Sequence, residues 1–223
     1  MLTHKELESM VDEFMETQDW VKVKISNELF KRKPDRMYTK GSLVLIFELK
    51  PENILQPEVD RGIGQCMGYL PYRVKPYLVI PEVWATYYRK IFAQLPFLGV
   101  LQYSNELSMV QPATDRLGDL QEFPQLEIRL TRLFLWRFLK KRVEDGLHSL
   151  DSIEDLLSQA YPLVKFYRQT IARMLLSMGY GRERYNPTSM EYDPFGKGSK
   201  SFFHIILHRN LRGAGIKGEK DAE

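Results

Sequence analysis

The feature that most constrains the fold is a continuous apolar run at residues 43–47, which ends on the charged sequence Glu48-Leu49-Lys50. A lysine-glycine pair precedes the run and Pro51 follows it, so its length and boundaries predict a strand buried on both faces. Side chains alternate along a strand, so Glu48 and Lys50 are expected on the same side. Charged groups at the rim of a buried strand need partners, water or a metal ion. The run therefore predicts a polar site at the edge of a sheet.

A second carboxylate precedes this strand, in Pro34-Asp35, thirteen residues before Glu48. Upstream of it, residues 21–25 alternate apolar and polar side chains, which predicts a half-exposed strand. A hairpin-like path would then bring Asp35 back toward Glu48 through the basic loop Lys31-Arg32-Lys33. Two carboxylates can hold a divalent cation and a lysine can stand beside it, which is the equipment for hydrolysing a phosphodiester.

Each of these positions also has an ordinary structural interpretation. Asp35 can be a turn residue after proline. Glu48 and Lys50 can form an exposed ion pair worth roughly 0 to 1 kcal/mol. Gln65 and Tyr69, four residues apart, can be the polar margin of a packed helix. The order and spacing of all the elements together favour a functional site over these separate explanations.

In these elements the chain resembles the PD-(D/E)xK nuclease superfamily, and more closely its branches similar to archaeal Holliday junction resolvases, RecB and Cas4, with small archaeal viral nucleases among them. The resemblance covers roughly residues 1–110 and includes Gln65-Cys-Met-Gly-Tyr69, on an expected helix from Asp60 to Leu70, where the family often carries Gln-x3-Tyr. It implies an α/β restriction-endonuclease-like fold, with a central mixed sheet flanked by helices. It also implies a metal-dependent DNA endonuclease, acting on junctions or flaps if it is structure-specific, that works as a homodimer.

The resemblance implies a role for each matching residue. Asp35 and Glu48 would bind Mg²⁺, for which Mn²⁺ would substitute. Lys50 would orient or help to deprotonate the attacking water and offset the charge that develops on the phosphate. Gln65 would hydrogen-bond the nucleophile, Lys50 or a phosphate, and Tyr69 would steady the same helix or contact the DNA backbone.

The family also has a glutamate on an N-terminal helix. Apolar residues at three- and four-residue spacing between positions 7 and 14 predict such a helix here. Glu8 lies at the edge of its apolar face, and the resemblance makes Glu8 a third catalytic and metal-binding carboxylate. Glu6 and Glu13 are alternatives for this position.

The second half of the chain differs in charge and pattern. Residues 1–125 hold 15 Lys and Arg against 17 Asp and Glu, whereas residues 126–223 hold 17 against 12, which suits a second domain that meets a polyanion. Beyond the motif, the pattern of the first half predicts further strands and a helix, and that of the second predicts three helices and a returning strand. The predicted strands are residues 77–80, 97–103 and 201–208; the predicted helices are residues 83–94, 126–143, 152–161 and 164–178.

Three helices followed by a hairpin resemble a winged helix, so we expect a mainly helical, winged-helix-like second domain. The expected organisation is a nuclease domain at 1–110, a linker at 111–125, a winged-helix-like domain at 126–212 and a disordered tail at 213–223. In such a domain the third helix would enter the major groove and the wing would approach phosphates. The expected DNA contacts are Lys31, Arg32, Lys33, Tyr69, Lys165, Arg168, Arg173, Lys197 and Lys200.

Other functions fit the same sequence. A non-catalytic DNA-binding or assembly protein would retain the nuclease fold, and an endonuclease of the TnsA kind would work as a subunit of a transposition complex. A protein-interaction module would use its basic half, or the winged helix, to bind a protein partner. The single cysteine, Cys66, excludes an internal disulfide, and no signal peptide or apolar segment of about 20 residues is present, so we expect a cytoplasmic protein (in the host cytoplasm if it is viral) with no membrane contact.

Overall fold

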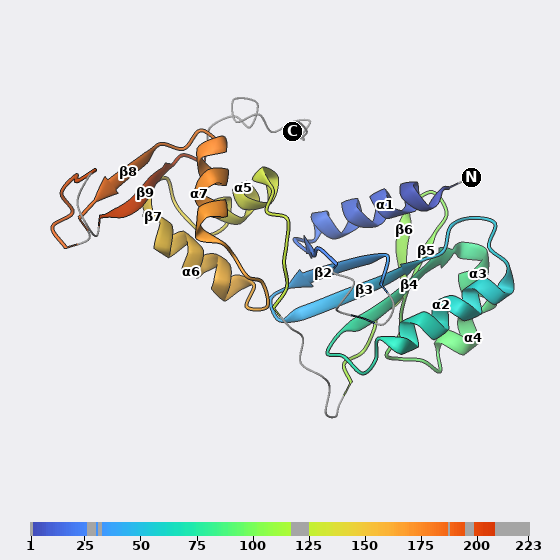
Figure 1. The fold of residues 1–223 in the computed structure, drawn as a ribbon. Helices are drawn as coiled ribbons and strands as arrows, with labels where there is room; N and C mark the ends of the chain where they lie inside the picture. Colours follow the sequence, from blue (N-terminus) through green and yellow to red (C-terminus); the bar gives the residue numbers. More distant parts are fainter. Residues whose placement is uncertain are drawn as a thin grey trace. The chain divides into compact units, whose positions relative to one another are not determined.

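The computed structural model describes residues 2–25, 30, 33–116, 125–186, 188–194 and 199–207. The chain divides into two compact units (Figure 1). Unit 1 comprises Met1–Ile128 and Tyr161–Val164, and unit 2 comprises Arg129–Ala160 and Lys165–Glu223. Among the described residues, no helix combines the length and the apolar character that crossing a membrane requires.

Unit 1 is built on a six-stranded mixed sheet in which the strands follow their order in the chain, β1-β2-β3-β4-β5-β6. The strands β3, β4 and β5 pair in parallel, and the other pairs are antiparallel. The strands are β1 (Val21–Lys22), β2 (Arg36–Lys40), β3 (Leu43–Leu49), β4 (Lys75–Pro81), β5 (Gly99–Tyr103) and β6 (Leu107–Gln111).

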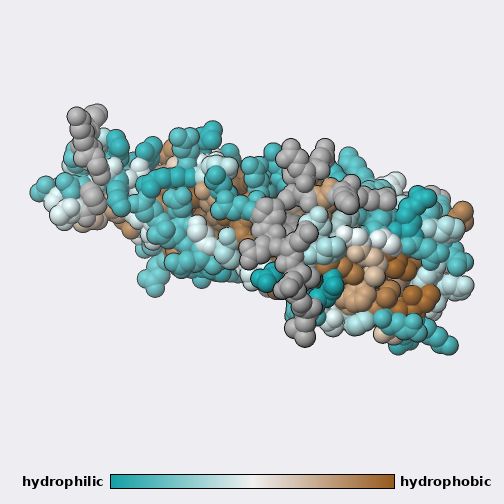
Figure 2. All heavy atoms as spheres, turned by 60° about the horizontal axis from the view of Figure 1, so that its bottom comes forward, coloured by the Kyte–Doolittle hydropathy of each residue, from teal (hydrophilic) through white to brown (hydrophobic). Residues whose placement is uncertain are grey.

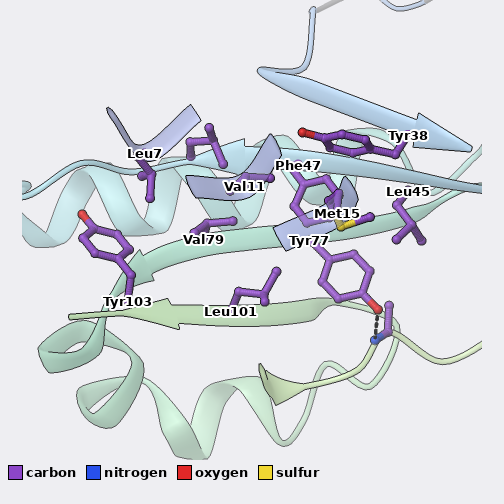
Figure 3. Close-up of a cluster of buried hydrophobic side chains, with 12 residues drawn as sticks. Leu7, Val11, Met15, Tyr38, Leu45, Phe47, Tyr77, Val79, Leu101 and Tyr103 are labelled. Carbon is purple, nitrogen blue, oxygen red and sulfur yellow. Dashed lines mark hydrogen bonds between the residues drawn. The ribbon is translucent and has the colours of Figure 1, made fainter. Parts of the chain in front are cut away.

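Helices cover both faces of this sheet (Figure 1). On one face, α1 (His4–Thr17) places Leu7, Val11 and Met15 against side chains of β2 to β5, as Figure 3 shows. On the other face, α2 (Gln56–Gly68), α3 (Glu82–Tyr87) and α4 (Arg89–Phe92) pack on Leu78, Ile80 and their neighbours. The expected α/β class, with a mixed sheet flanked by helices, is confirmed.

The strand that the sequence most clearly predicts, β3, contains the site glutamate. Its side chains alternate between the two cores: Leu45, Phe47 and Leu49 face α1. Glu48 therefore faces α2. The strand is central, because β2 pairs with one edge and β4 with the other, so its apolar run reflects burial on both faces.

Several elements of unit 1 differ from the sequence prediction. The strand expected over residues 21–25 is only two residues long, because Val23 forms an isolated bridge with Ile128. The helix expected over residues 83–94 is two short helices that meet at Tyr88. Within this segment Tyr87 is exposed and Tyr88 is buried.

Two further differences concern the ends of elements. The helix expected to begin at Asp60 begins at Gln56, where Pro57 suits the first turn and the Glu58 carboxylate accepts a hydrogen bond from the Leu55 N–H. The expected linker from residue 111 follows directly on β6, an edge strand that the sequence did not predict.

Exposed hydrophobic side chains also occur in unit 1, including Val83, and Figure 2 shows a hydrophobic area bordered by hydrophilic residues on one face.

In the described residues, unit 2 contains three helices and a three-stranded antiparallel sheet of order β7-β9-β8. The expected helix over residues 126–143 begins only at Arg132, since the Thr131 hydroxyl accepts a hydrogen bond from the Phe134 N–H. The strand β7 was not predicted; of the expected hairpin, the sequence placed only the returning strand over residues 201–208, which corresponds to β9. The elements are α5 (Arg132–Lys140), β7 (Gly146–Ser149), α6 (Leu150–Ala160), α7 (Arg168–Ser177), β8 (Arg182–Tyr185) and β9 (Lys200–Ile205).

Candidate active site

Glu48 is a buried carboxylate on the α2 side of the sheet, with a relative exposure of 1%. A buried charge is costly unless hydrogen-bond donors surround it. The Tyr69 hydroxyl donates to Glu48 Oε1 at 2.5 Å, and Gln65 Nε2 donates to Glu48 Oε2 at 2.6 Å. Gln65 on α2 and Tyr69 directly after it form the Gln-x3-Tyr pair. Both therefore contact Glu48 directly.

Lys50 follows β3 and is held through both its backbone and its side chain. Its N–H donates to the Val79 carbonyl at 2.9 Å, and its own carbonyl accepts from the Tyr103 hydroxyl at 2.8 Å. Its ammonium Nζ donates to Gln65 Oε1 at 2.8 Å. Because an amide side chain has one acceptor end and one donor end, Gln65 bridges Lys50 and Glu48.

A glycine on α2 makes room for this lysine. A Cβ built at Gly62 would lie 2.7 Å from Lys50 Cε and 2.8 Å from Leu78 Cδ1, and both distances are too short for carbon atoms. The Lys50 stem can therefore cross the helix only where residue 62 lacks a side chain.

We expect Gly62→Ala to displace the Lys50 side chain and to destabilise unit 1 by about 1 to 3 kcal/mol through overpacking. The matched control is Gly64→Ala on the same helix, where an added Cβ meets nothing within 4 Å. That control should be neutral or stabilise the protein by about 0.5 to 1 kcal/mol, because alanine favours a helix. Urea denaturation of both variants measures the difference, and equal stabilities would contradict the packing argument.

Asp35 is fixed beside the end of β3. Its backbone N–H donates to the Phe47 carbonyl at 3.1 Å, and its Oδ2 accepts from the Leu49 N–H at 2.7 Å. The side chain is 27% exposed. Within the part of the chain that the structure describes, Asp35 Oδ1 accepts no hydrogen bond, so this oxygen can take a ligand.

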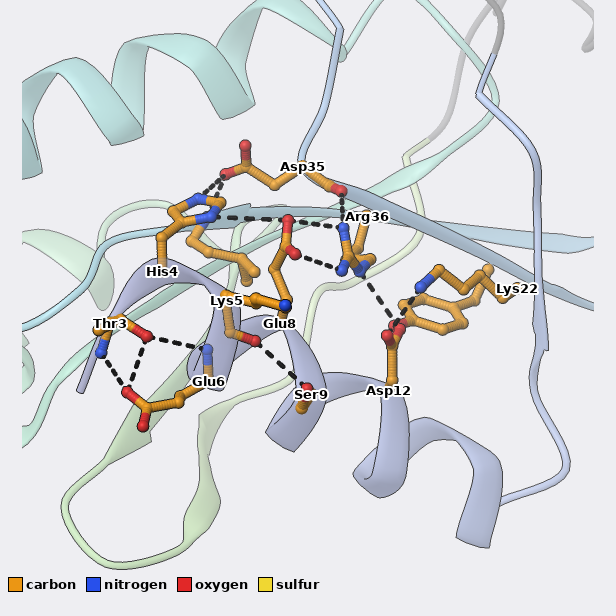
Figure 4. Close-up of polar contacts among 12 residues, drawn as sticks. Thr3, His4, Lys5, Glu6, Glu8, Ser9, Asp12, Lys22, Asp35 and Arg36 are labelled. Carbon is orange, nitrogen blue, oxygen red and sulfur yellow. Dashed lines mark hydrogen bonds and ion pairs between the residues drawn. The ribbon is translucent and has the colours of Figure 1, made fainter.

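Glu8 lies on α1, as expected, but its carboxylate is engaged by Arg36 (Figure 4). Arg36 Nη1 donates to Glu8 Oε1 and Arg36 Nη2 lies by Glu8 Oε2, both at 2.7 Å. His4 stands between the two carboxylates: its Nδ1 is 3.5 Å from Glu8 Oε1 and its Nε2 is 3.6 Å from Asp35 Oδ2. Neither Arg36 nor His4 was predicted from the sequence, where the available signals were that Arg36 follows Asp35 and that His4 precedes Glu8 by one helical turn.

The alternatives to Glu8 lie elsewhere on α1. The Glu6 carboxylate caps its own helix, because it accepts from the Thr3 N–H at 2.8 Å while the Thr3 hydroxyl accepts from the Glu6 N–H at 3.3 Å. These contacts lower the pKa of Glu6. Since Glu6 serves the helix terminus and Glu8 reaches Asp35 through His4, the structure brings Glu8 to the site and not Glu6.

Burial and the charges of the site raise the pKa of two neighbouring groups. Burial raises the pKa of the Tyr69 hydroxyl, and its hydrogen bond to Glu48 raises it further, with Asp35 adding to the effect. Burial also raises the pKa of the Cys66 thiol, again with contributions from the charges of Glu48 and Asp35. Both groups therefore stay protonated, and Tyr69 acts as a donor to Glu48.

The donor chemistry of the site fits a hard divalent cation. Asp35 and Glu48 supply carboxylate oxygens, the ligands that Mg²⁺ prefers, and Mg²⁺ retains several waters instead of requiring a full protein cage. Among the described residues, no group of three or more His, Cys, Asp or Glu side chains is already arranged to hold a metal ion. A cation here would therefore rest on the two carboxylates, with Asp35 Oδ1 the oxygen that has no protein donor within the described chain.

The expected DNA contacts differ in whether a carboxylate already pairs with them. Arg168 and Lys200 both pair with Asp151 on α6, Lys200 at 2.7 Å, and these contacts lower the pKa of Asp151. Lys165 lies over the ring of Tyr167, and Arg173 is exposed on α7. Lys33 is exposed in unit 1, whereas Lys31, Arg32 and Lys197 lie outside the described residues.

Two exposed arginines of β8 were not predicted as contacts. Arg182 and Arg184 alternate along this strand with Glu183, so they point to the same side. Arg182 donates to the Ser201 hydroxyl and Arg184 to the Pro194 carbonyl. Their two-residue spacing in the sequence was the available signal.

No family model matches the chain, and no curated protein or solved structure is detectably similar to it.

Proposed function

We propose that the protein is a metal-dependent DNA endonuclease of the PD-(D/E)xK type. The observation that carries the proposal is the hydrogen-bonded chain from Tyr69 through Glu48 and Gln65 to Lys50, with Asp35 fixed to the same strand end. A buried carboxylate linked through hydrogen bonds to three other polar side chains is more than an incidental surface ion pair. It also joins four of the positions that the sequence motif selects.

Each residue of this site has a chemical task. Asp35 and Glu48 would hold Mg²⁺, which supplies Lewis-acid stabilisation and a more acidic water when bound. Lys50 brings a positive charge to the same edge of the sheet, where it orients the attacking water and offsets the charge that develops on the phosphate. Gln65 fixes the lysine relative to Glu48. Tyr69 keeps the Glu48 carboxylate from turning away.

The order of elements in unit 2 supports a winged-helix-like assignment. A helix and a strand precede two further helices, and two antiparallel strands follow, with β9 between β7 and β8. In this proposal the exposed face of α7, with Arg173, meets the major groove, and the cations of β8 and β9 lie near phosphates. We also propose a homodimer, since two active sites can then address two strands.

The first experiment offers four-way junctions, flaps, single strands and duplex plasmid to the full chain, with Mg²⁺, Mn²⁺ or a chelator. We expect metal-dependent cutting that Asp35→Asn abolishes and that Glu82→Gln, an exposed carboxylate on α3, retains. Cutting that is unaffected by Asp35→Asn would refute the assigned site. Absence of cutting on every substrate would refute an endonuclease that acts alone.

One observation favours a second candidate, a non-catalytic DNA-binding or assembly protein. Both oxygens of Glu48 already accept hydrogen bonds, and Glu8 is taken up by Arg36. A chain that had lost catalysis would keep such a closed polar network for stability alone. This candidate predicts DNA affinity without cutting. Cutting should stay absent even when a partner subunit of a transposition complex is present.

The salt dependence of DNA binding tests the role of unit 2. Each phosphate neutralised by a side chain contributes about 0.9 to the slope of log affinity against log salt. We expect Lys165→Ala with Arg173→Ala to lower the slope by about 2. Arg168→Ala should lower it less, because Asp151 already pairs with Arg168. Fluorescence anisotropy at several salt concentrations measures these slopes, and a flat slope in the wild type would exclude phosphate binding.

A further inference from the structure

We propose that Arg36 is a positioning residue that withholds Glu8 from the metal ion, so that the DNA-free centre takes its metal on Asp35 and Glu48 alone. The inference rests on the proposed function, because it concerns the cation of the same site. The family resemblance makes Glu8 a third ligand, whereas the contacts in the structure assign it to a guanidinium.

The geometry of the pair leaves neither oxygen of Glu8 without a cationic partner. Two parallel contacts of 2.7 Å join the two terminal nitrogens of Arg36 to Oε1 and Oε2 of Glu8. Such bidentate pairs are shorter, stronger and more directional than single ion pairs. The side chains are only 16% and 25% exposed, so water screens the pair less than it screens a surface ion pair.

Arg36 is in turn held from two other sides. Its Nε lies 3.3 Å from Asp12 Oδ1, and its Nη1 also donates to the Asp35 carbonyl at 2.9 Å. Asp12 is fixed by Lys22 at 2.7 Å and by the Tyr38 hydroxyl. Because each neighbour restrains the guanidinium, Arg36 cannot follow Glu8 if that carboxylate moves toward a cation.

To share a cation with Asp35, a released Glu8 would have to move past His4, whose ring stands between the two carboxylates. One imidazole spans the gap, since His4 is 3.5 Å from Glu8 and 3.6 Å from Asp35 (Figure 4). Removing the guanidinium would release Glu8 and would also remove a positive charge next to Asp35. Both effects favour cation binding, so Arg36 is expected to weaken the metal affinity of the resting protein.

The test measures Mn²⁺ binding to the full chain without DNA, by isothermal titration calorimetry and by the electron paramagnetic resonance signal of free Mn²⁺. We expect Glu8→Gln to change the wild-type Kd by less than about threefold, because Glu8 is not a ligand. Arg36→Met should tighten the Kd by about tenfold or add a second Mn²⁺. The double variant should return to the wild-type Kd. A loss of about tenfold or more in Glu8→Gln alone, or unchanged binding in Arg36→Met, would overturn the proposal.

Two further variants separate this proposal from the proposed function. If Asp35→Asn and Glu48→Gln leave Mn²⁺ binding unchanged, or if the wild type binds no Mn²⁺, the nuclease site itself fails. The Arg36 contact is then judged by a double-mutant cycle on metal-free unfolding with Arg36→Met and Glu8→Gln. We expect a coupling of about tenfold in the unfolding constant, and additive effects would show that Arg36 does not hold Glu8. If Arg36→Met does not fold, Glu8→Gln and the conservative Arg36→Lys carry both measurements.

Discussion

Lys50→Met is expected to reduce metal-dependent cutting by about 10²- to 10⁴-fold, the range for loss of a positioned group that assists proton transfer. Methionine keeps much of the stem that crosses Gly62, so the packing of α2 on the strand should survive. The variant loses the ammonium that contacts Gln65 and that would face the attacking water. Single-turnover rates on the best substrate, at saturating Mg²⁺, measure the effect, and the affinity for DNA should stay within about twofold of wild type.

The matched control for this variant is Lys40→Met. Lys40 is an exposed lysine at the end of the neighbouring strand β2, where its ammonium donates to the Gln18 carbonyl. Its replacement removes the same charge from the same sheet, so cutting should persist if the effect of Lys50 depends on position. Equal losses in the two variants, or a Lys50→Met enzyme as fast as wild type, would contradict the assigned role.

Phe47→Ala should lower the free energy of unfolding of unit 1 by about 3 to 5 kcal/mol, because it leaves a cavity in the core between α1 and the sheet. Phe47 is 1% exposed, stacks on Tyr77 with ring centroids 5.2 Å apart, and meets Tyr38 edge-on at 5.5 Å. The residue immediately precedes Glu48. Loss of this ring therefore loosens the strand that positions the buried carboxylate.

Urea denaturation of the full chain in a Trp136→Phe background measures this effect, since the remaining tryptophans, Trp20 and Trp84, both lie in unit 1. The control is Leu43→Ala on the same strand, where the side chain is 44% exposed. Its effect should stay within about 0.5 kcal/mol. If Phe47→Ala were as mild as this control, the stacked rings would not form the core that Figure 3 shows.

The central part of the site was predictable because it depends on short-range rules. A period of two along β3 was enough to put Glu48 and Lys50 on one side, and a helical period was enough to identify the buried face of α1. The spacing of Gln65 and Tyr69 was enough to select α2. Their specific partners were not predictable, because whether Gln65 contacts Lys50, Glu48 or both depends on how closely α2 approaches the strand at Gly62.

The missed elements share a physical cause. The strands β6 and β7 are short and largely exposed or half-buried, so they carry little of the apolar alternation that marks a buried strand. The contact of Arg36 with Glu8 joins residues 28 positions apart and follows from tertiary packing alone. An arginine beside an aspartate gives no periodic signal, and its partner is set by where α1 crosses the sheet.

Position 65 requires a side chain that accepts a hydrogen bond at one end and donates one at the other, as the amide of Gln65 does. Its oxygen faces an ammonium and its nitrogen faces a carboxylate. A glutamate of the same shape would oppose Glu48 with like charge, and a lysine would oppose Lys50. Rotating the amide by half a turn would produce both mismatches at once. The site therefore admits one orientation of a neutral, two-ended group, and this selectivity ties the side-chain identity on α2 to the charges of Glu48 on β3 and of Lys50 directly after it.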